Sequence, residues 1–322
     1  MLQDLKGAGT MGVALLGYGT VGKAFFEMAS ERKDIKVKWL LALNAPDEID
    51  CTVTDDFDDI INDPEVDTVV ELIGGLHPAY EYVKKALHAG KNVVTANKWL
   101  MAIYYRELVQ TAWGNGTALR CTAAAGGGIP WLHSLARISE TDKVSRVWGI
   151  MNGTSNYILS AMTSQGVSYE DALAEAQQLG YAEADPTADV EGYDARRKLV
   201  ISANIAFGCC LREEDVPCQG ITQITSSQVS ENKFKGKVFK LIAHAEQKAD
   251  GSVSAAVEPL LFDSNEQEAN VKGADNMIAL EAERVGIQAF FGAGAGGYPT
   301  ASNVLADCIE ISQGCEPFYV KL

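Results

Sequence analysis

The chain has 322 residues, which is room for two domains and a large buried core. Apolar residues make up 47% and charged residues 22%, so the composition is that of a folded globular protein and not of a disordered one. The formal net charge is −16, a sign that repels phosphate backbones and anionic lipid surfaces. We therefore expect no nucleic-acid or membrane partner.

The sequence carries no sign of export, membrane insertion or a structural metal cluster. No run approaches the ~20 consecutive apolar residues that a membrane span needs. The first six residues lack the basic-then-apolar pattern of a secretory signal, and none of the seven cysteines forms a CxxC pair. These features predict a reduced, cytoplasmic protein.

The first half of the chain alternates short apolar runs with helical patterns. The apolar runs predict strands over residues 13–16, 37–43, 66–73 and 91–95. Helices are expected over 23–32 and from Pro78 to His88, where Gly90 suits the C-terminal cap. Strands that alternate with helices at this spacing predict an α/β fold with a Rossmann-type parallel sheet, over a nucleotide-binding domain of residues 1–130.

Two neighbouring stretches match the dinucleotide-binding pattern GxGxxG. Residues 7–12 match by letter, but only six residues precede them and several of these are polar, so we expect a flexible leader there. Residues 17–22, GYGTVG, follow an apolar run and open a helix, which is the context that dinucleotide binding requires. The second stretch is therefore the predicted cofactor site.

Each position in the second stretch has a physical role. Gly17 permits the tight turn, Gly19 lets a pyrophosphate approach the backbone, and Gly22 permits close packing of helix on strand. Thr20 and Val21 lie in the same stretch and are counted with the cofactor site, because the N-terminus of the helix that follows would offer free N–H groups to the phosphates. The alternative is a purely structural glycine turn.

The choice between NAD and NADP depends on the end of the second strand. An enzyme that uses NAD usually places an acidic residue there to hold the ribose hydroxyls. Residues 41–44 read Leu-Ala-Leu-Asn and offer neither an acid nor an arginine. The missing acid favours NADP, although Asn44 can bond a ribose with or without its phosphate.

A lysine follows the fourth predicted strand. Residues 93–98 read VVTANK, which puts Lys98 just beyond the carboxyl end of the strand, with Thr95 and Asn97 as polar neighbours. Ligands of open parallel sheets bind at such ends, so Lys98 is expected in the cofactor crevice. A solvated surface lysine is the alternative.

Two further segments lie in the second half of the chain. Residues 152–159, NGTSNYIL, are on their own typical of a turn and a helix cap. Residues 180–199 contain a turn and then a helix in which Asp194 and Lys198, four apart, share one face and can pair. An exposed pair would contribute little, but the apolar stretch after Lys198 indicates a buried helix, where such a pair suits proton transfer.

The later elements mix helix and strand. A helix is expected over residues 233–248, strands over 253–257 and 289–291, and a last helix from about Thr300. Residues 126–130 are expected to mark the passage between two domains. This mixture predicts an α+β domain over residues 131–291 and a C-terminal segment, 292–322, that returns to the nucleotide domain.

Five of these motifs, in this order, resemble homoserine dehydrogenases over nearly the whole chain. They are GYGTVG at 17–22, VVTANK at 93–98, NGTSNYIL at 152–159, GYAEADPTADVEGYDARRK at 180–198 and GAGAGGYPTAS at 292–302. The resemblance implies reversible NAD(P)-dependent oxidation of L-homoserine to L-aspartate 4-semialdehyde, a step toward threonine and methionine. It also implies that residues 131–291 bind substrate and form a homodimer or a higher homo-oligomer.

The resemblance implies roles for charged residues. Lys198 would exchange a proton with the C4 oxygen, and Lys98 would lie against the same oxygen and the nicotinamide. Asp194 would orient the substrate, Glu183 would hold its ammonium group, and Asp189 would support both. Two lysines near an alkoxide and carboxylates near an ammonium group make physical sense.

Further positions follow from the same resemblance. The backbone around Gly153 and Thr154 would face the substrate, and Thr95 and Gly296 would face the nicotinamide ribose. The family also binds a monovalent cation through backbone carbonyls, which here would be those of Ala125, Gly127 and Ile129. Thr122 and Ala125 replace the acid and the valine that the family often carries at these positions, which puts the cation in doubt. No regulatory amino-acid-binding domain is expected after the last helix.

Two other functions stay open from the sequence. One is an NAD(P) oxidoreductase of the same architecture that acts on another small amino or hydroxy acid. The other is a nucleotide-sensing protein without catalysis, which the presence of both Lys98 and Lys198 disfavours.

Overall fold

The computed structural model describes residues 9–314, which fall into two compact units. The first unit contains the residues up to Gly128 together with those from Gly296 on, and the second contains Ile129–Ala295. Among the residues described, no helix is long and apolar enough to cross a membrane.

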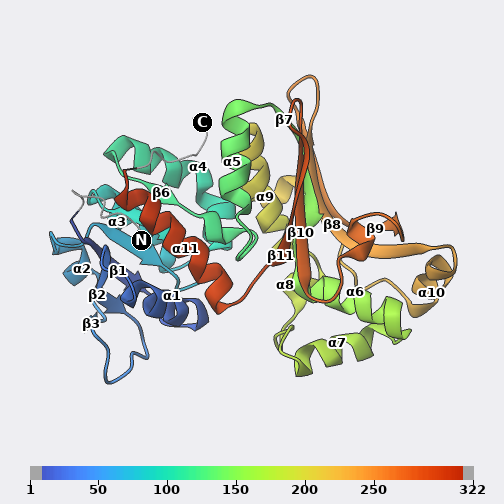
Figure 1. Ribbon diagram of the computed structural model, residues 1–322, viewed down its shortest axis with the longest axis horizontal. Coiled ribbons are helices and arrows are strands. Elements are labelled where there is room, and N and C mark those ends of the chain that lie inside the picture. The colour runs from blue at the N-terminus through green and yellow to red at the C-terminus, as the bar shows by residue number, and fades with distance from the viewer. Residues whose placement is uncertain (1–8, 315–322) are drawn as a thin grey trace, which may run out of the picture. The chain divides into compact units, whose positions relative to one another are not determined.

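The first unit is built on a six-stranded parallel sheet with the strand order β3-β2-β1-β4-β5-β6 (Figure 1). Its strands are β1 (Met11–Leu16), β2 (Ile35–Leu41), β3 (Thr52–Thr54), β4 (Thr68–Glu71), β5 (Asn92–Thr95) and β6 (Leu119–Arg120). Its helices are α1 (Thr20–Ser30), α2 (Phe57–Asn62), α3 (Ala79–His88), α4 (Lys98–Asn115), the 3-10 turn η1 (Thr122–Ala124) and α11 (Gly297–Ser312). The predicted Rossmann-type sheet is confirmed.

The core of the first unit joins the beginning of the chain to its last helix. All six residues of β1 are buried, as expected for a central parallel strand covered on both faces. Helix α1 buries Ala24 and Phe25, and α11 adds Val304 and Cys308 to the same cluster. Figure 1 shows α11, in red, beside α1, in blue.

The second unit is built on a five-stranded antiparallel sheet with the order β11-β10-β7-β8-β9. Its strands are β7 (Val144–Ile150), β8 (Lys237–Gln247), β9 (Val253–Asp263), β10 (Asp275–Ala282) and β11 (Gly286–Ala293). Its helices are α5 (Trp131–Thr141), α6 (Gly153–Gln165), α7 (Tyr169–Gln178), α8 (Thr187–Val190), α9 (Tyr193–Phe207) and α10 (Ser226–Phe234), with 3-10 turns η2 (Glu213–Asp215) and η3 (Glu268–Asn270). The mixture of helix and antiparallel sheet confirms the α+β expectation.

The two faces of this antiparallel sheet differ. On one face Val147, Leu280 and Ala245 lie side by side in register and are fully buried beneath helices α5 and α9. On the other face Trp148 bonds through its indole N–H to Glu268 Oε1, at 2.8 Å, and the turn η3 covers only part of the strands. In β11 this second face leaves Phe291 56% exposed.

The helix predicted over residues 233–248 is wrong. Helix α10 ends at Phe234, and the next residues form strand β8 between β7 and β9. Lysine, alanine and glutamate in this stretch suit a helix, but pairing with two strands and burial of Leu241 and Ala243 decide the structure.

The expected leader over residues 7–12 is also wrong where the structure describes it. Residues 7 and 8 lie outside the described part, but Met11 and Gly12 are the first residues of β1. A side chain at Gly12 would put its Cβ 1.8 Å from Glu65 O, so this glycine is required by packing. The second strand starts and ends two residues earlier than predicted, and Leu43 is fully exposed.

Candidate functional site

The glycine fingerprint of the first unit has the local geometry of a dinucleotide cradle. Gly17 has φ +97°, and a Cβ there would lie 2.6 Å from Leu72 O. A Cβ on Gly22 would lie 2.3 Å from Gly17 O. Gly19, which caps α1, has no atom within 4 Å of its Cβ position. Two glycines are thus demanded by packing and the third leaves the backbone open, which fits a bound pyrophosphate.

Helix α1 begins at Thr20 and not at Lys23 as the pattern predicted. Thr20 and Val21 therefore belong to its first turn, where backbone N–H groups have no partner within the helix. The N-terminus of α11 lies against the same turn, because a Cβ on Gly297 would be 3.1 Å from Thr20 O. Gly296, with φ +125°, caps α11 at this point.

The carboxyl ends of β4 and β5 carry a second polar group in the first unit. Thr95 is buried at the end of β5, and Asn97 caps α4 by accepting from Leu100 N at 3.1 Å. Lys98 is the first residue of α4 and is half-buried. Thr95 donates to Glu71 Oε2 at 2.6 Å, so a buried glutamate that the sequence reasoning missed belongs to this group.

In the second unit, Lys198 and Asp194 form a buried ion pair. Lys198 Nζ lies 2.7 Å from Asp194 Oδ2 and donates to Met151 O at 2.7 Å. Both side chains are less than a tenth exposed. The predicted pairing on one helix face is present, and it is buried, not a solvated surface pair.

Asn152 connects this pair to a third charged residue. Its Nδ2 donates to Asp194 Oδ2 at 2.9 Å and to Asp189 Oδ1 at 2.6 Å, while its Oδ1 caps α6 by accepting from Ser155 N. Burial and then the neighbouring Asp194 carboxylate raise the pKa of Asp189. Sequence reasoning treated Asn152 as a cap alone, and its position next to Gly153 was the only signal of a second role.

The remaining predicted substrate residues are Gly153, Thr154 and Glu183. Gly153 packs against residue 274, because a Cβ there would lie 2.5 Å from Ala274 O. Thr154 donates through its hydroxyl to Tyr181 O at 2.6 Å. Glu183 is exposed in the connection between α7 and α8, and the contacts of the described residues do not join its carboxylate to Lys198.

Two residues of the predicted cation segment, Ala125 and Gly127, lie in the first unit, where nearby polar groups already have protein partners. Thr122 donates through its backbone N and its hydroxyl to Asp307 Oδ2, at 3.0 and 2.7 Å. Asn303 Nδ2 donates to Gly127 O at 2.6 Å. Across residues 9–314, no group of three or more histidine, cysteine, aspartate or glutamate side chains is arranged to hold a metal ion. The segment offers backbone carbonyls alone, including that of the buried Ala125.

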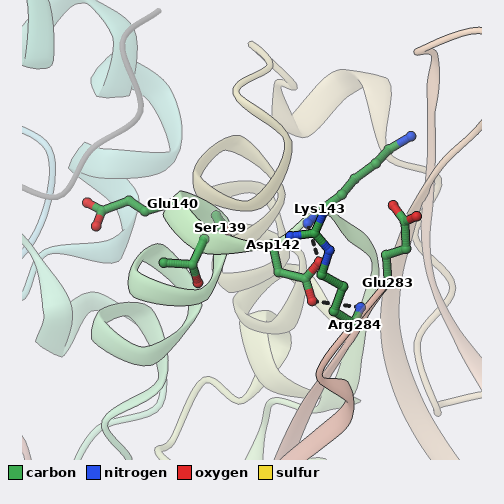
Figure 2. A pocket seen from close by; sticks show the side chains of 7 residues that line it. Ser139, Glu140, Asp142, Lys143, Glu283 and Arg284 are labelled. Carbon is green, nitrogen blue, oxygen red and sulfur yellow. Dashed lines mark hydrogen bonds between the residues drawn. The ribbon is translucent and has the colours of Figure 1, made fainter.

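A pocket of about 400 Å³ lies elsewhere on the second unit, where α5 ends and β10 turns into β11 (Figure 2). Figure 2 shows Asp142 directed at Arg284, and its Oδ2 accepts from the backbone N of Arg284 and of Val285 at 2.8 and 2.9 Å. Lys143, Glu140 and Glu283 line the same pocket. Two basic side chains and three acidic ones line this pocket, and none of the predicted site residues takes part.

The fold and the fingerprint define the class of protein, an NAD(P)-dependent oxidoreductase. Two family models match: "Homoserine dehydrogenase, NAD binding domain" over residues 17–121 and "Homoserine dehydrogenase" over residues 130–309. The homoserine dehydrogenases of Corynebacterium glutamicum and Bacillus subtilis are 41% and 39% identical, over 94% and 93% of this chain and 72% of each relative. The chain belongs to the homoserine dehydrogenase family.

Solved structures agree with this assignment. The homoserine dehydrogenase from Thiobacillus denitrificans has a TM-score of 0.87 and 38% identity, covering 95% of this chain and 74% of that one. The S. aureus enzyme at pH 7.0 has a TM-score of 0.83 and 35% identity, covering 97% and 78%. The fold and family that the five motifs predicted are confirmed.

Proposed function

We propose that this protein catalyses the reversible oxidation of L-homoserine to L-aspartate 4-semialdehyde, a step toward threonine and methionine. The observation that carries the proposal is the buried Lys198–Asp194 pair, held by Asn152, in a chain whose other unit has an open glycine cradle. The nicotinamide, when bound, supplies the hydride acceptor and donor. Family membership adds the substrate, because the relatives are named as homoserine dehydrogenases.

Lys198 is the proton carrier in this proposal. Its ammonium group has three N–H donors, and two of them are directed at Asp194 and at the carbonyl of Met151. In reduction the third proton passes to the C4 oxygen. In oxidation the neutral amine keeps both contacts and offers its lone pair to the homoserine hydroxyl proton.

The remaining charged residues bind and orient the substrate in this proposal. Asp194 holds the Lys198 amine in place, and Asp189 reaches the same network through Asn152. Glu183, which is exposed, would hold the substrate ammonium group. Lys98 would stabilise charge on the reacting oxygen.

The cofactor would be held mainly by backbone groups. The residues proposed to bind it are Gly17, Gly19, Thr20, Val21, Gly22, Thr95, Lys98 and Gly296. We propose NADP as the preferred form, because β2 ends at Leu41 and neither acid nor arginine stands in residues 41–44. The ratio of kcat/KM for the two cofactors tests this preference.

Two further expectations remain proposals. A monovalent cation at Ala125, Gly127 and Ile129 is tested by replacing sodium with choline at constant ionic strength, and unchanged kcat and KM would remove it. A homodimer or a higher homo-oligomer is supported by the partly covered sheet face that exposes Phe291. Light scattering of the wild type and of Phe291→Asp tests the dimer, and a monomeric wild type would contradict it.

The deciding experiment follows nicotinamide absorbance with the purified protein, L-homoserine, and NAD or NADP in turn. We expect homoserine-dependent reduction of the cofactor, and no reduction with L-serine, which lacks one methylene group. Nucleotide binding is measured separately by fluorescence titration. A protein that binds nucleotide but turns over homoserine with neither cofactor would contradict the proposal and support a nucleotide sensor.

A further inference from the structure

Glu71 is a fully buried carboxylate at the carboxyl end of the parallel sheet. It is the last residue of β4, between the fingerprint strand β1 and the strand β5 that leads to Lys98. Its Oε2 accepts from the Thr95 hydroxyl at 2.6 Å, and its Oε1 accepts from Ile73 N and Gly74 N at 2.9 and 3.3 Å. Burial raises the pKa of this carboxyl, and these hydrogen bonds act against the rise. An apolar residue would fill the space without the cost of desolvating an acid, so packing alone does not account for Glu71.

The hydrogen bonds of Glu71 determine the orientation of Thr95. A hydroxyl has one proton, and Thr95 gives it to Glu71. The same oxygen accepts from Asn97 N at 3.0 Å, at the cap of the helix that begins with Lys98. The carboxylate therefore sets which way the Thr95 hydroxyl points and supports the cap of α4.

The same carboxylate also shapes the turn after β4. By accepting from two successive backbone N–H groups, it holds the start of the turn 72–75. Gly74 and Gly75 then have φ +78° and +70°, and no atom lies within 4 Å of either Cβ position. Leu72 O lies where a side chain on Gly17 would be, so the turn lies directly against the fingerprint.

A second hydrogen bond connects the segments that follow β4 and β5. Asn97 Nδ2 donates to Gly75 O at 2.6 Å, at the far end of the turn that Glu71 holds at its start. Gly74 and Gly75, which lie between the hydrogen bonds of Glu71 and that of Asn97, leave backbone exposed beside Gly17 and Thr95. A flat ring such as that of a nicotinamide can approach backbone of this kind closely.

We propose that Glu71 is a positioning residue for the cofactor: its carboxylate sets the turn 72–75 and the Thr95 hydroxyl in the arrangement that receives the nicotinamide end. This inference rests on the proposed function for the identity of the cofactor. It predicts that Glu71 controls cofactor affinity through Thr95 and through the turn, without contact with homoserine.

The test measures cofactor dissociation constants by fluorescence titration and thermal midpoints on the same samples. Glu71→Gln is expected to raise the dissociation constant about tenfold, because one acceptor oxygen becomes a donor that opposes the backbone N–H groups or Thr95. The KM for homoserine is expected to stay within about twofold, because Glu71 acts through Thr95 and the turn 72–75 and not through contact with homoserine. The matched control is Asp67→Asn, directly before the start of the same strand, where the carboxylate also accepts from a backbone N–H, that of Gly12, at 2.8 Å.

Substitutions of Thr95 are a second set of variants, and they test the inference even if Glu71→Gln fails to fold. Thr95→Val removes the donor to Glu71 and should weaken cofactor binding by a similar factor, while Thr95→Ser keeps the hydroxyl and should restore it. Glu71→Gln combined with Thr95→Val should be clearly less than multiplicative. Unchanged affinity in folded Glu71→Gln, or an equal loss in Asp67→Asn, would overturn the inference.

These outcomes are separable from failure of the proposed function. The titrations use NADP and NAD without homoserine, so an absence of turnover leaves the result for Glu71 intact. A wild-type protein that binds neither nucleotide would instead contradict the proposed function itself.

Discussion

The two units build their sites in opposite ways. In the first unit the fingerprint works by leaving side chains out: Gly17 and Gly22 allow close packing, and Gly19 leaves the backbone open. In the second unit Lys198, Asp194 and Asn152 work by placing side chains in a buried, hydrogen-bonded network. A group that only has to be held can be bound by backbone, whereas moving a proton requires a titratable group at a defined atom. Substitutions should therefore affect binding in one unit and catalysis in the other.

The largest expected effect comes from Lys198→Met. It removes the proton carrier and should lower kcat about a thousandfold in both directions, within the range of general acid–base catalysis. The dissociation constant for NADP should stay within about twofold, because the cradle lies in the first unit. Lys235→Met is the control, since that lysine lies in an exposed pair with Glu231. A Lys198→Met enzyme with more than a tenth of the wild-type kcat would remove Lys198 from the chemistry.

Substitutions of Asn152 separate its two roles, which are capping helix α6 and bridging Asp189 and Asp194. Asn152→Ser keeps a good N-cap for α6 but loses the bridge between Asp189 and Asp194, so kcat should fall about tenfold to a hundredfold with little change in stability. Asn152→Ala loses both and should also cost about 1 kcal/mol in the free energy of unfolding. If Asn152→Ser retains full kcat, the bridge has no part in catalysis.

Substitutions of Gly17 and Gly19 separate stability from cofactor binding in the first unit. Gly17→Ala should destabilise the fold by about 2 kcal/mol or more, because its φ is +97° and its Cβ would meet Leu72 O at 2.6 Å. Gly19→Ala should leave the unfolding free energy nearly unchanged but weaken NADP binding about tenfold, because its methyl group would enter the open space. Denaturant titration and fluorescence titration measure the two effects. Equal losses of stability in both variants would contradict this division of roles.

The smallest expected effects are in the pH dependence of stability, and they have opposite signs in the two units. In the first unit burial raises the pKa of Asp307 to about 7, against 3.8 for an ordinary aspartate. The unfolded chain then binds fewer protons than the folded one between these values, so the free energy of unfolding falls as pH rises through the window. The contribution should be at least about 1 kcal/mol. Asp307→Asn should abolish this fall in denaturant titrations at successive pH values.

In the second unit burial and then nearby Lys272 lower the pKa of Lys240 to about 8, against 10.5 for an ordinary lysine. Between these values the unfolded chain binds more protons, so the free energy of unfolding rises with pH. Lys240→Met should flatten the rise, although it removes the Lys240 donor from Asn156 Oδ1 and from Val271 O. A rise of equal size in Lys240→Met would assign it to other groups.

The parts of the fold and site that could be predicted from the sequence are those with short-range patterns. The fingerprint at 17–22 and the Asp194–Lys198 spacing each lie within one or two elements, so their geometry follows from strand, turn and helix periodicity. The contact of Glu71 with Thr95 joins two strands, and that of Asn152 with Asp189 joins two helices. Only the assembled fold shows such pairs.

The helix predicted over residues 233–248 is wrong for the same reason, namely that contacts between separate elements decide the structure there. Residues 237–247 have the composition of a helix, and only pairing with β7 and β9 makes them a strand. Glu183 shows a further limit of the motif: its place in the motif predicts a role at the substrate, while its exposed side chain shows no contact with Lys198 that would support the role.

The packing of α11 on α1 has a consequence for synthesis on the ribosome. Val304 and Cys308 complete the core around Phe25, although all the residues of the second unit are translated in between. The second unit therefore has its whole sequence available before the first can close its core, which reverses the usual order in which the N-terminal domain folds first. Until α11 emerges, the apolar side of α1 stays uncovered, and the nascent chain is most exposed to aggregation and most dependent on chaperones during that interval.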